Sequence, residues 1–338
     1  MYTTNHKINN QLSIWLIFMF WIVAIMIVVG GLTRLTDSGL SITKWQLFSG
    51  FLPPLNSEEW TNYFDLYKEI PEFKLQNYAM TIQEFKIIFW WEWAHRFLGR
   101  LIGIGFLLPL IYFSFKIKIS KLLNLYLIFV LICFQGFIGW YMVSSGLVNR
   151  VDVSHFRLSF HLFIAFLILS LIFWNFLKIK HTHNISNKIN PIIPFLFLIL
   201  VFIQIIIGAF VSGMDAGKIY NSWPFMGNTY FPDDNNFTNL FKLAAFSDPS
   251  LVQFIHRNLA YVISFFYILI LFKIYKDKIN ELYKSISFLG FFIILQIALG
   301  ILTILFGAQI FIASMHQISS IFLVSSSIYF FYLNTNFN

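Results

Sequence analysis

Long apolar runs alternate with short polar segments along this chain, and the pattern predicts membrane-spanning helices. A helix needs roughly 20 apolar residues to cross the hydrocarbon core of a bilayer. Lipid cannot satisfy exposed backbone amides, so helices are the structure expected for such runs. Eight runs are long enough, at residues 12–32, 91–114, 122–146, 155–177, 192–213, 252–272, 285–307 and 311–333.

The polar segments form two alternating sets that differ in charge. The first set holds eleven Lys or Arg residues and two acidic residues, in residues 1–11, 115–121, 178–190 and 273–284. The second set holds eight Lys or Arg residues and twelve acidic residues, in residues 33–90, 147–154 and 214–250. Because cytoplasmic loops carry the excess of Lys and Arg, both chain ends are expected in the cytoplasm. The long segment 33–90, with Pro53-Pro54, Trp60 and Tyr63, is expected to fold into an outer cap with short surface helices.

The composition supports a membrane protein. Of the 338 residues, 58% are hydrophobic and 11% are charged, whereas soluble domains carry about 25% charged residues. The net charge of +8 does not indicate nucleic acid, because the charges lie in the short loops. The single cysteine, Cys133, lies in an apolar run, cannot form an intrachain disulfide and is expected to be a small buried side chain. The first run ends at Gly30-Gly31 without a cleavage site and is expected to be a retained helix.

The two halves of the sequence repeat a set of features in the same order. Each half has four predicted helices, so both halves insert with the same orientation. This predicts two similar four-helix bundles, residues 1–180 and 181–338, related by a parallel repeat. The recurring pairs are Asp37-Ser38-Gly39 with Asp215-Ala216-Gly217, Trp45 with Trp223, His95-Arg96 with His256-Arg257, Gln135 with Gln296, Gly139 with Gly300, and His161 with His316.

Four of the eight histidines take part in this repeat. His95, His161, His256 and His316 each lie four to six residues inside the outer end of a predicted helix, or roughly 6–9 Å deep. Two antiparallel helices in each half therefore present one imidazole each at a matching level, as two axial ligands of a haem require. A packing role is the alternative for any single membrane histidine, and zinc would need further Cys or carboxylate ligands.

The other histidines are not assigned to a site. His6, His181 and His183 are expected to be solvated in cytoplasmic segments. His155, at the outer start of a helix, has no counterpart in the other half, and its role is left open together with that of Cys133.

Charged neighbours of the histidines add to the picture. Arg96 and Arg257 each follow a candidate ligand, and we expect them to pair with haem propionates; the alternative is an interfacial anchor. Glu92 shares a helix face with His95, and the repeat places Gln253 at its position in the second half. A carboxylate beside a haem can move protons or stabilise a cation, so chemistry is expected in the N-terminal half. A polar interfacial role for Glu92 is the alternative.

Five segments together form a recognisable pattern: Gly30–Ser41, Glu92–Arg96, Arg157–Leu162, Gln253–Arg257 and Met315–Gln317. They resemble segments of haem A synthases, and the resemblance covers nearly the whole chain. It implies an oxidoreductase that oxidises the C8 methyl of haem O to a formyl group, giving haem A for cytochrome oxidase. Without a cysteine pair in the first outer loop, the chain is similar to the proteobacterial and mitochondrial branch.

The resemblance also implies roles for residues and partners. His256 and His316 would ligate a resident haem b, His95 and His161 would receive the substrate haem O, and Glu92 would be the catalytic carboxylate. The expected location is the cell inner membrane, with the haem sites towards its outer side. Candidate partners are the haem O synthase, cytochrome oxidase assembly factors and a second copy of the chain; the electron donor, the oxygen source and the haem O delivery route are left open.

Two other functions remain open from the sequence alone. A two-haem electron carrier would bind redox-active haem without modifying it, although all four histidines are predicted on one side of the membrane. A haem transporter or assembly chaperone would bind haem loosely in both halves, and the chain has no nucleotide-binding motif to drive transport.

Overall fold

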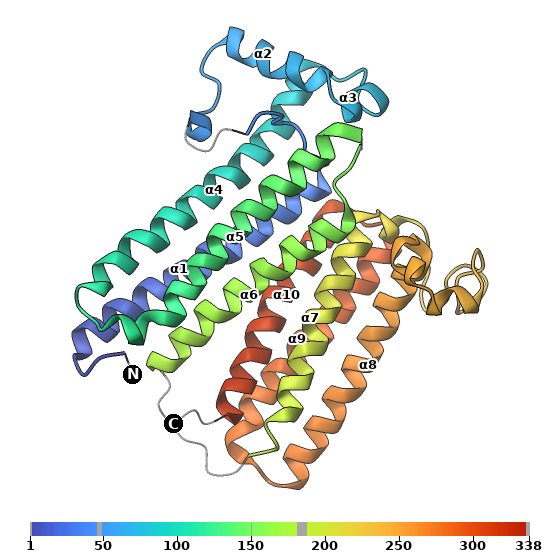
Figure 1. Ribbon diagram of the computed structural model, residues 1–338. Coiled ribbons are helices and arrows are strands. Elements are labelled where there is room, and N and C mark those ends of the chain that lie inside the picture. Colours follow the sequence, from blue (N-terminus) through green and yellow to red (C-terminus); the bar gives the residue numbers. More distant parts are fainter. Residues whose placement is uncertain (1, 46–48, 150, 181–187, 336–338) are drawn as a thin grey trace.

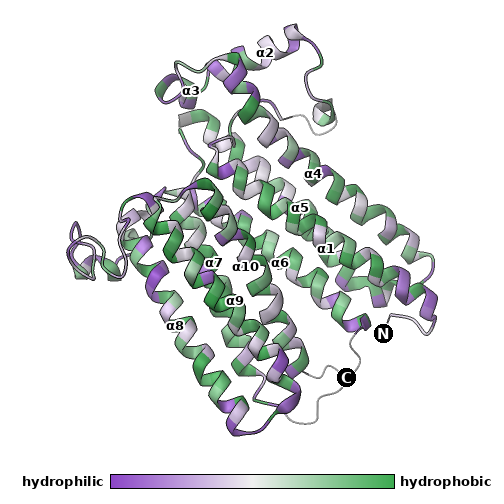
Figure 2. Ribbon diagram, turned by 180° about the vertical axis from the view of Figure 1, so that it is seen from behind, coloured by the Kyte–Doolittle hydropathy of each residue, from purple (hydrophilic) through white to green (hydrophobic). Residues whose placement is uncertain are grey.

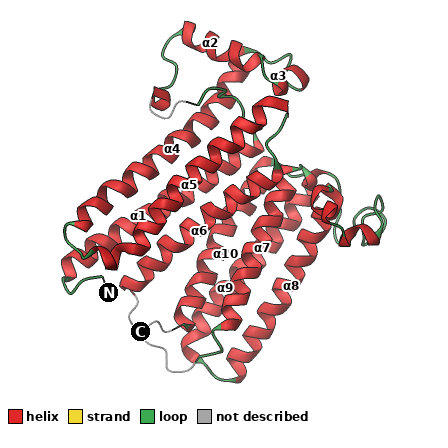
Figure 3. Cartoon of the chain, in the orientation of Figure 1, coloured by secondary structure: helices red, strands yellow, loops and turns green. Residues whose placement is uncertain are grey.

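The computed structural model describes residues 2–45, 49–149, 151–180 and 188–335, and these fold almost entirely into helices (Figures 1 and 3). Eight helices in this part are long and apolar enough to cross a membrane, as predicted. They are α1 (His6–Leu35), α4 (Ile82–Ser114), α5 (Ile119–Asn149), α6 (His155–Lys180), α7 (Ile192–Gly213), α8 (Pro249–Lys276), α9 (Asn280–Leu305) and α10 (Ile310–Asn334). The predicted all-helical membrane fold is confirmed. His181 and His183 lie outside the described residues.

The segment between α1 and α4, expected on the outer side, forms the expected cap, with short helices above α4 and α5 (Figure 1). It contains the 3₁₀ turn η1 (Ser49–Phe51) and the helices α2 (Ser57–Lys68) and α3 (Pro71–Leu75). Asn56 caps α2 by accepting a hydrogen bond from the backbone N–H of Glu59. Phe64 and Tyr67 of α2 pack with Phe85 and Phe89 of α4 in a separate small core. The second outer segment contains η2 (Ala216–Lys218), η3 (Phe237–Phe241) and η4 (Leu243–Ser247).

Helix α4 begins at Ile82 and not near residue 91, so the sequence prediction of its start is wrong. Thr81 and Glu84 form a capping box, in which each side chain binds the backbone N–H of the other residue. The first turns of α4 also contain Lys86. A search for long apolar runs therefore leaves these turns out, although they are helical. His95 therefore lies four residues into the apolar run that begins at residue 91, but 13 residues into the helix that begins at Ile82.

The long helices are hydrophobic along most of their length (Figure 2). They bury some of their apolar side chains against each other and expose others. One large core contains fully buried side chains of several helices, among them Leu16, Phe106, Phe166 and Phe330. Cys133 is exposed on α5, so the expectation that it is buried is wrong. It lies on a face of α5 that also exposes Phe134 and Phe137, as expected of a side turned to lipid.

The helices pack in the same order in the two halves. In the first half α1 contacts α4 and α6, while α5 contacts α4 and α6. In the second half α7 contacts α8 and α10, while α9 contacts α8 and α10. Asp37 and Asp215, at matching positions after α1 and α7, both have left-handed backbone conformations, with φ of 48° and 51°. The predicted repeat of two similar four-helix bundles, residues 1–180 and 181–338, stays a prediction.

Candidate functional site: two histidine pairs

The four repeated histidines meet in two pairs, each on two helices of one half. His95 of α4 faces His161 of α6, with ring centroids 6.4 Å apart. His256 of α8 faces His316 of α10, also with centroids 6.4 Å apart. The helices α6, α8 and α10 begin about two turns before their histidines, whereas α4 begins more than three turns before His95. Helix packing therefore brings the imidazoles to one level.

Each imidazole lies against a glycine of a neighbouring helix. A Cβ placed on Gly30 of α1 would lie 2.8 Å from Cε1 of His95, and one on Gly139 of α5 would lie 3.1 Å from Cε1 of His161. In the second half, Gly208 of α7 and Gly300 of α9 lie against His256 and His316, with corresponding distances of 3.0 Å. The absence of a side chain at these four positions lets the rings approach the helix backbones.

Glutamine side chains hold three of the four histidines. Nε2 of Gln135 donates to the backbone carbonyl of His161 at 3.0 Å, and Nε2 of Gln204 to that of His256 at 3.0 Å. Nε2 of Gln296 lies 3.3 Å from Nε2 of His316. Each glutamine precedes a contacting glycine by one helical turn, and the corresponding residue before Gly30 is Met26. His95 is therefore the one histidine of the pairs whose neighbouring helix has no amide at this position.

Glu92 is buried beside the N-terminal pair, and its two oxygens bind the loop after α1 and Arg96 of its own helix. Its side chain is 3% exposed. Oε2 accepts hydrogen bonds from the hydroxyl of Ser41 and the backbone N–H of Ile42, both at 2.7 Å. Oε1 accepts from Nη2 and Nε of Arg96, at 2.6 and 3.1 Å. Nη2 of Arg96 also donates to the carbonyl oxygen of Ile42 at 2.8 Å. A buried carboxylate needs such partners, because an unpaired charge there would be costly.

In the second half, Arg257 and Gln253 both bind the loop residue that corresponds to Ile42, but with a different set of hydrogen bonds. Nη2 of Arg257 donates to the carbonyl oxygen of Tyr220 at 2.9 Å, and Tyr220 corresponds to Ile42 in the repeat. Nε2 of Gln253, at the position of Glu92, donates to the same carbonyl at 3.1 Å. Gln253 is buried, as is Glu92. In both halves an arginine donates to the loop carbonyl, but Glu92 accepts from the loop N–H whereas Gln253 donates to the loop carbonyl.

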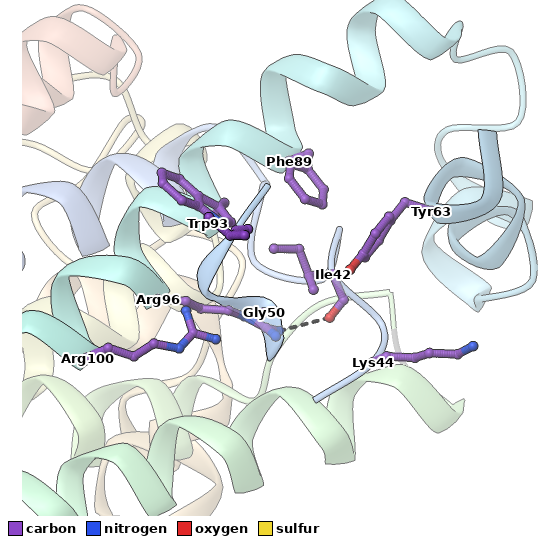
Figure 4. Close-up of a pocket in the computed structure, with 9 residues that line it drawn as sticks. Ile42, Lys44, Gly50, Tyr63, Phe89, Trp93, Arg96 and Arg100 are labelled. Atoms are coloured by element: carbon purple, nitrogen blue, oxygen red, sulfur yellow. Dashed lines mark hydrogen bonds between the residues drawn. The ribbon is translucent and has the colours of Figure 1, made fainter. Parts of the chain in front are cut away.

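A small pocket opens next to Arg96 of α4, on the side of the cap (Figure 4). The cationic side chains of Lys44, Arg96 and Arg100 line it together with Tyr63 and Trp93. The guanidinium of Arg96 also lies over the ring of Trp45, 5.4 Å from its centroid. The predicted propionate-binding role of Arg96 and Arg257 stays a prediction: both side chains bind loop carbonyls, and Nε of Arg257 is buried without a partner among the described residues.

His155 and several residues that the sequence did not reveal complete the description of the site. His155 lies outside the two pairs, where its Nε2 is 3.1 Å from the carbonyl oxygen of Phe246 in η4. Sequence reasoning missed Gly30, Gly208 and Gln204, although the Gln-x-x-x-Gly spacing also occurs at 204–208. It also missed Ser41 and the backbone of Ile42, since no pattern shows which loop atoms reach a membrane carboxylate.

The histidine pairs fit a haem. Two imidazoles that bind one metal from opposite sides, with bonds of about 2 Å, have ring centroids roughly 6 Å apart. The Nδ1 atoms of all four histidines are buried without a hydrogen-bond partner among the described residues. Nor does any group of three or more His, Cys, Asp or Glu side chains there converge as a metal site, so each pair offers two ligands only. Two ligands suit a metal whose other positions are filled by a macrocycle.

Fold and sites together define a multi-pass membrane protein with two internal histidine pairs suited to haem. A sequence model of the COX15-CtaA family, described as cytochrome oxidase assembly protein, matches residues 13–328. The chain belongs to this family.

Named relatives match almost the whole chain. A protein of Pelagibacter ubique (strain HTCC1062) named "Heme A synthase" is 47% identical over 338 residues, covering 99% of this chain and 100% of its own. Proteins with the same name from Rickettsia bellii (strain RML369-C) and Rickettsia prowazekii (strain Madrid E) are 42% and 40% identical. Each of these alignments covers 97% of this chain and 99% of the relative.

Proposed function

We propose that this protein is a haem A synthase, an oxidoreductase that converts the C8 methyl of haem O into the formyl group of haem A. The family match and the names of the relatives support the reaction class. The different roles proposed for the two sites rest on one observation: a buried carboxylate, Glu92, lies beside the first histidine pair, and a buried amide, Gln253, takes its position beside the second. An ionisable carboxylate at one site and a neutral amide at the other favour chemistry at the first.

His95 and His161 receive haem O in this proposal, and His256 and His316 hold a resident haem b. Bound haem supplies iron for redox chemistry, and the protein supplies orientation and electrostatics. The carboxylate of Glu92 stabilises positive charge or accepts a proton at the carbon being oxidised. Arg96 fixes the position of this carboxylate through two hydrogen bonds. The arginines beside each pair, Arg96 and Arg257, are the proposed propionate partners.

The proposed setting is the inner membrane of the cell, with both termini in the cytoplasm. The charge distribution between the loops supports this orientation. The cap over α4 and the loop that binds Glu92 then lie on the outer side, where the haem propionates would point. The product would serve the assembly of cytochrome oxidase, in agreement with the family description.

The test is haem analysis in a host that makes haem O but no haem A. We expect the wild-type chain to produce haem A, detected by chromatography with mass detection. We expect Glu92→Gln to accumulate haem O or a hydroxylated form, with haem A formation lower by about 10²–10⁴-fold, as for other catalytic acids and bases. Glu84→Gln is the control, because it removes an exposed capping carboxylate from the same helix.

The alternatives give different results. If the wild type makes no modified haem but shows a reducible low-spin spectrum, the protein is an electron carrier. If both sites release their haem readily and unmodified, it is a transporter or chaperone. Equal haem A formation by Glu92→Gln and wild type would contradict the role of Glu92.

A further inference from the structure

A side-chain hydrogen bond links α10, which carries His316, to α1, the first helix of the N-terminal half. Gln317 directly follows His316 on α10. Its Nε2 donates a hydrogen bond of 2.9 Å to the backbone carbonyl of Ile27 on α1. The contact joins residues 290 positions apart in the chain. It therefore belongs to the interface between the halves, where α1 packs against α10 (Figure 1).

Two consecutive glycines of α1 receive one side chain from each half. The imidazole of His95 lies against Gly30, and the amide of Gln317 lies against Gly31 so closely that a Cβ on Gly31 would overlap its oxygen. Gly31 thus allows the amide to reach the α1 backbone. A shift of α1 that changes the contact with Gln317 also moves the surface on which His95 rests.

The opposite interface, between α6 and α7, has no corresponding contact. The repeat places Leu162 of α6 at the position of Gln317, and Ala209 of α7 at the position of Gly31. A leucine cannot donate a hydrogen bond, and the methyl group of an alanine occupies the space that the amide uses at α1. This hydrogen bond therefore occurs at only one of the two interfaces: it joins the helix that carries His316 to the helix on which His95 rests.

We propose that Gln317 is a positioning residue that couples the two histidine sites, so that haem bound between His256 and His316 favours the geometry in which His95 and His161 bind theirs. This rests on the proposed function, because it requires both pairs to bind haem. Interhelical hydrogen bonds in membrane proteins correspond to a factor of about 3–15 in an equilibrium constant. The coupling between the sites is expected within that range.

The test uses the purified full-length protein and ferric haem b as the probe for both sites. The dissociation constant of the N-terminal site is measured with the C-terminal site filled, and again in a His256→Ala background where that site is disabled. We expect the filled C-terminal site to tighten binding about 3–15-fold. In Gln317→Leu, which installs the residue of the opposite interface, the two values should be equal. Ser319→Ala, which removes a bond to Gln296 within the C-terminal half, should keep the difference.

A second measurement follows the contact itself without any haem. Gly31→Ala should lower the thermal unfolding temperature of the apoprotein when Gln317 is present. In a Gln317→Ala background the amide is gone, so the same substitution should have a much smaller effect. Equal effects of Gly31→Ala in both backgrounds would overturn the proposed contact.

The outcomes separate the two proposals. If neither site binds haem, the proposed function fails and the coupling fails with it. If both sites bind haem but the coupling is absent, or persists in Gln317→Leu, only the coupling is overturned. Loss of the coupling in Ser319→Ala as well as in Gln317→Leu would also overturn it, because the effect would then be local to the His316 site.

Discussion

At the scale of single residues, the glycines beside the histidines determine whether the pairs can form. Gly139 and Gly136 both lie on α5, but only a Cβ on Gly139 would meet an imidazole, that of His161, at 3.1 Å. We expect Gly139→Ala to weaken haem binding at the N-terminal pair, whereas Gly136→Ala, which has open space around its Cβ, should leave binding unchanged. Haem titration of the two purified variants checks this. Equal affinity in both would show that the ring tolerates a methyl group at position 139.

The two histidine pairs differ in the residue that precedes the contacting glycine by one helical turn. Gln204 holds the backbone of His256, whereas Met26 occupies the corresponding position next to His95. A substrate site must exchange its haem and a resident site must retain it, so an additional amide should slow release. We expect Met26→Gln to slow haem loss from the N-terminal pair, and Gln204→Met to accelerate loss from the C-terminal pair, each by about 3–15-fold.

The measurement for this exchange is the rate of haem transfer to an excess of a haem-scavenging apoprotein, followed by absorbance. Single-pair backgrounds, with His256→Ala or His95→Ala, assign each rate to its site. Unchanged rates in both swapped variants would show that the amide does not control retention.

The chemistry-bearing residues were predictable at this scale, and their immediate surroundings were not. Histidines and a glutamate in apolar helices are rare and costly, so they stand out in a sequence. The hydrogen bonds from Ser41 and Ile42 to Glu92 depend on how the loop after α1 folds back over α4. Cys133 shows the same limit: an apolar run alone does not reveal which face of a helix meets lipid.

At the scale of elements, the outer cap contains a buried carboxyl group next to the N-terminal site. Glu72 of α3 is 3% exposed, and its Oε1 accepts hydrogen bonds from Tyr67 and Asn77. Burial raises the pKa of Glu72 from 4.5 to about 8; the hydrogen bond from Tyr67 opposes this rise, and the charge of Glu92 adds to it. More distant negative charges on Asp152 and Asp37 act in the same direction.

This pKa makes the stability of the cap depend on pH. Because the pKa of Glu72 is raised in the folded state, its protonation contributes to the free energy of unfolding. This contribution is complete below pH 4.5 and is lost as the pH rises to about 8. We expect the wild type to lose stability over this range with a slope of at most about 1.4 kcal/mol per pH unit from this group. Glu72→Gln should flatten the slope, as measured by thermal unfolding from pH 5 to 9. Parallel slopes for both proteins would argue that Glu72 is ionised in the folded cap.

The helices themselves were largely predictable, and their polar ends were not. The run 192–213 coincides with α7, because its apolar residues begin and end with the helix. The first turns of α4 are helical through capping by Thr81 and Glu84, which hydropathy does not detect. The cap on segment 33–90 was expected from its aromatic residues, whose packing against Phe85 and Phe89 the structure supplies.

At the scale of the whole molecule, one arginine joins the corresponding turns of the two halves. Arg34 of α1 pairs with Asp37 at 2.5 Å and with Asp215 of the second half at 3.1 Å. The Arg34 side chain is 15% exposed, whereas Lys218, which also pairs with Asp215, is 57% exposed. Burial alone would raise the pKa of Asp215, but the bonds and charges of Lys218 and Arg34 hold it below its usual value.

These exposures predict unequal effects of two substitutions. Arg34→Gln leaves two carboxylates without their shared partner and should lower the free energy of unfolding by about 1–3 kcal/mol. Lys218→Gln removes a surface ion pair and should cost less than about 1 kcal/mol. Chemical unfolding in detergent compares the two variants. Similar losses in both would mean that Arg34 does not hold the halves together.

The arrangement of two corresponding sites in one chain was predictable from the internal repeat, whereas the link through Gln317 was not. A repeat predicts what the halves share, such as the histidine pairs and the left-handed Asp37 and Asp215. Contacts at the interface between the halves depend on residues that break the repeat, and these become visible only when the helices are packed.

The central claim is that one histidine pair receives the substrate while the other holds a resident haem. The most direct measurement is the haem content of His95→Ala and His316→Ala, each purified from a host that makes both haem b and haem O. We expect His95→Ala to retain haem b and to lose haem O and haem A, whereas His316→Ala should lose haem b. The reverse pattern, or equal loss of all haems in both variants, would contradict these roles of the two pairs.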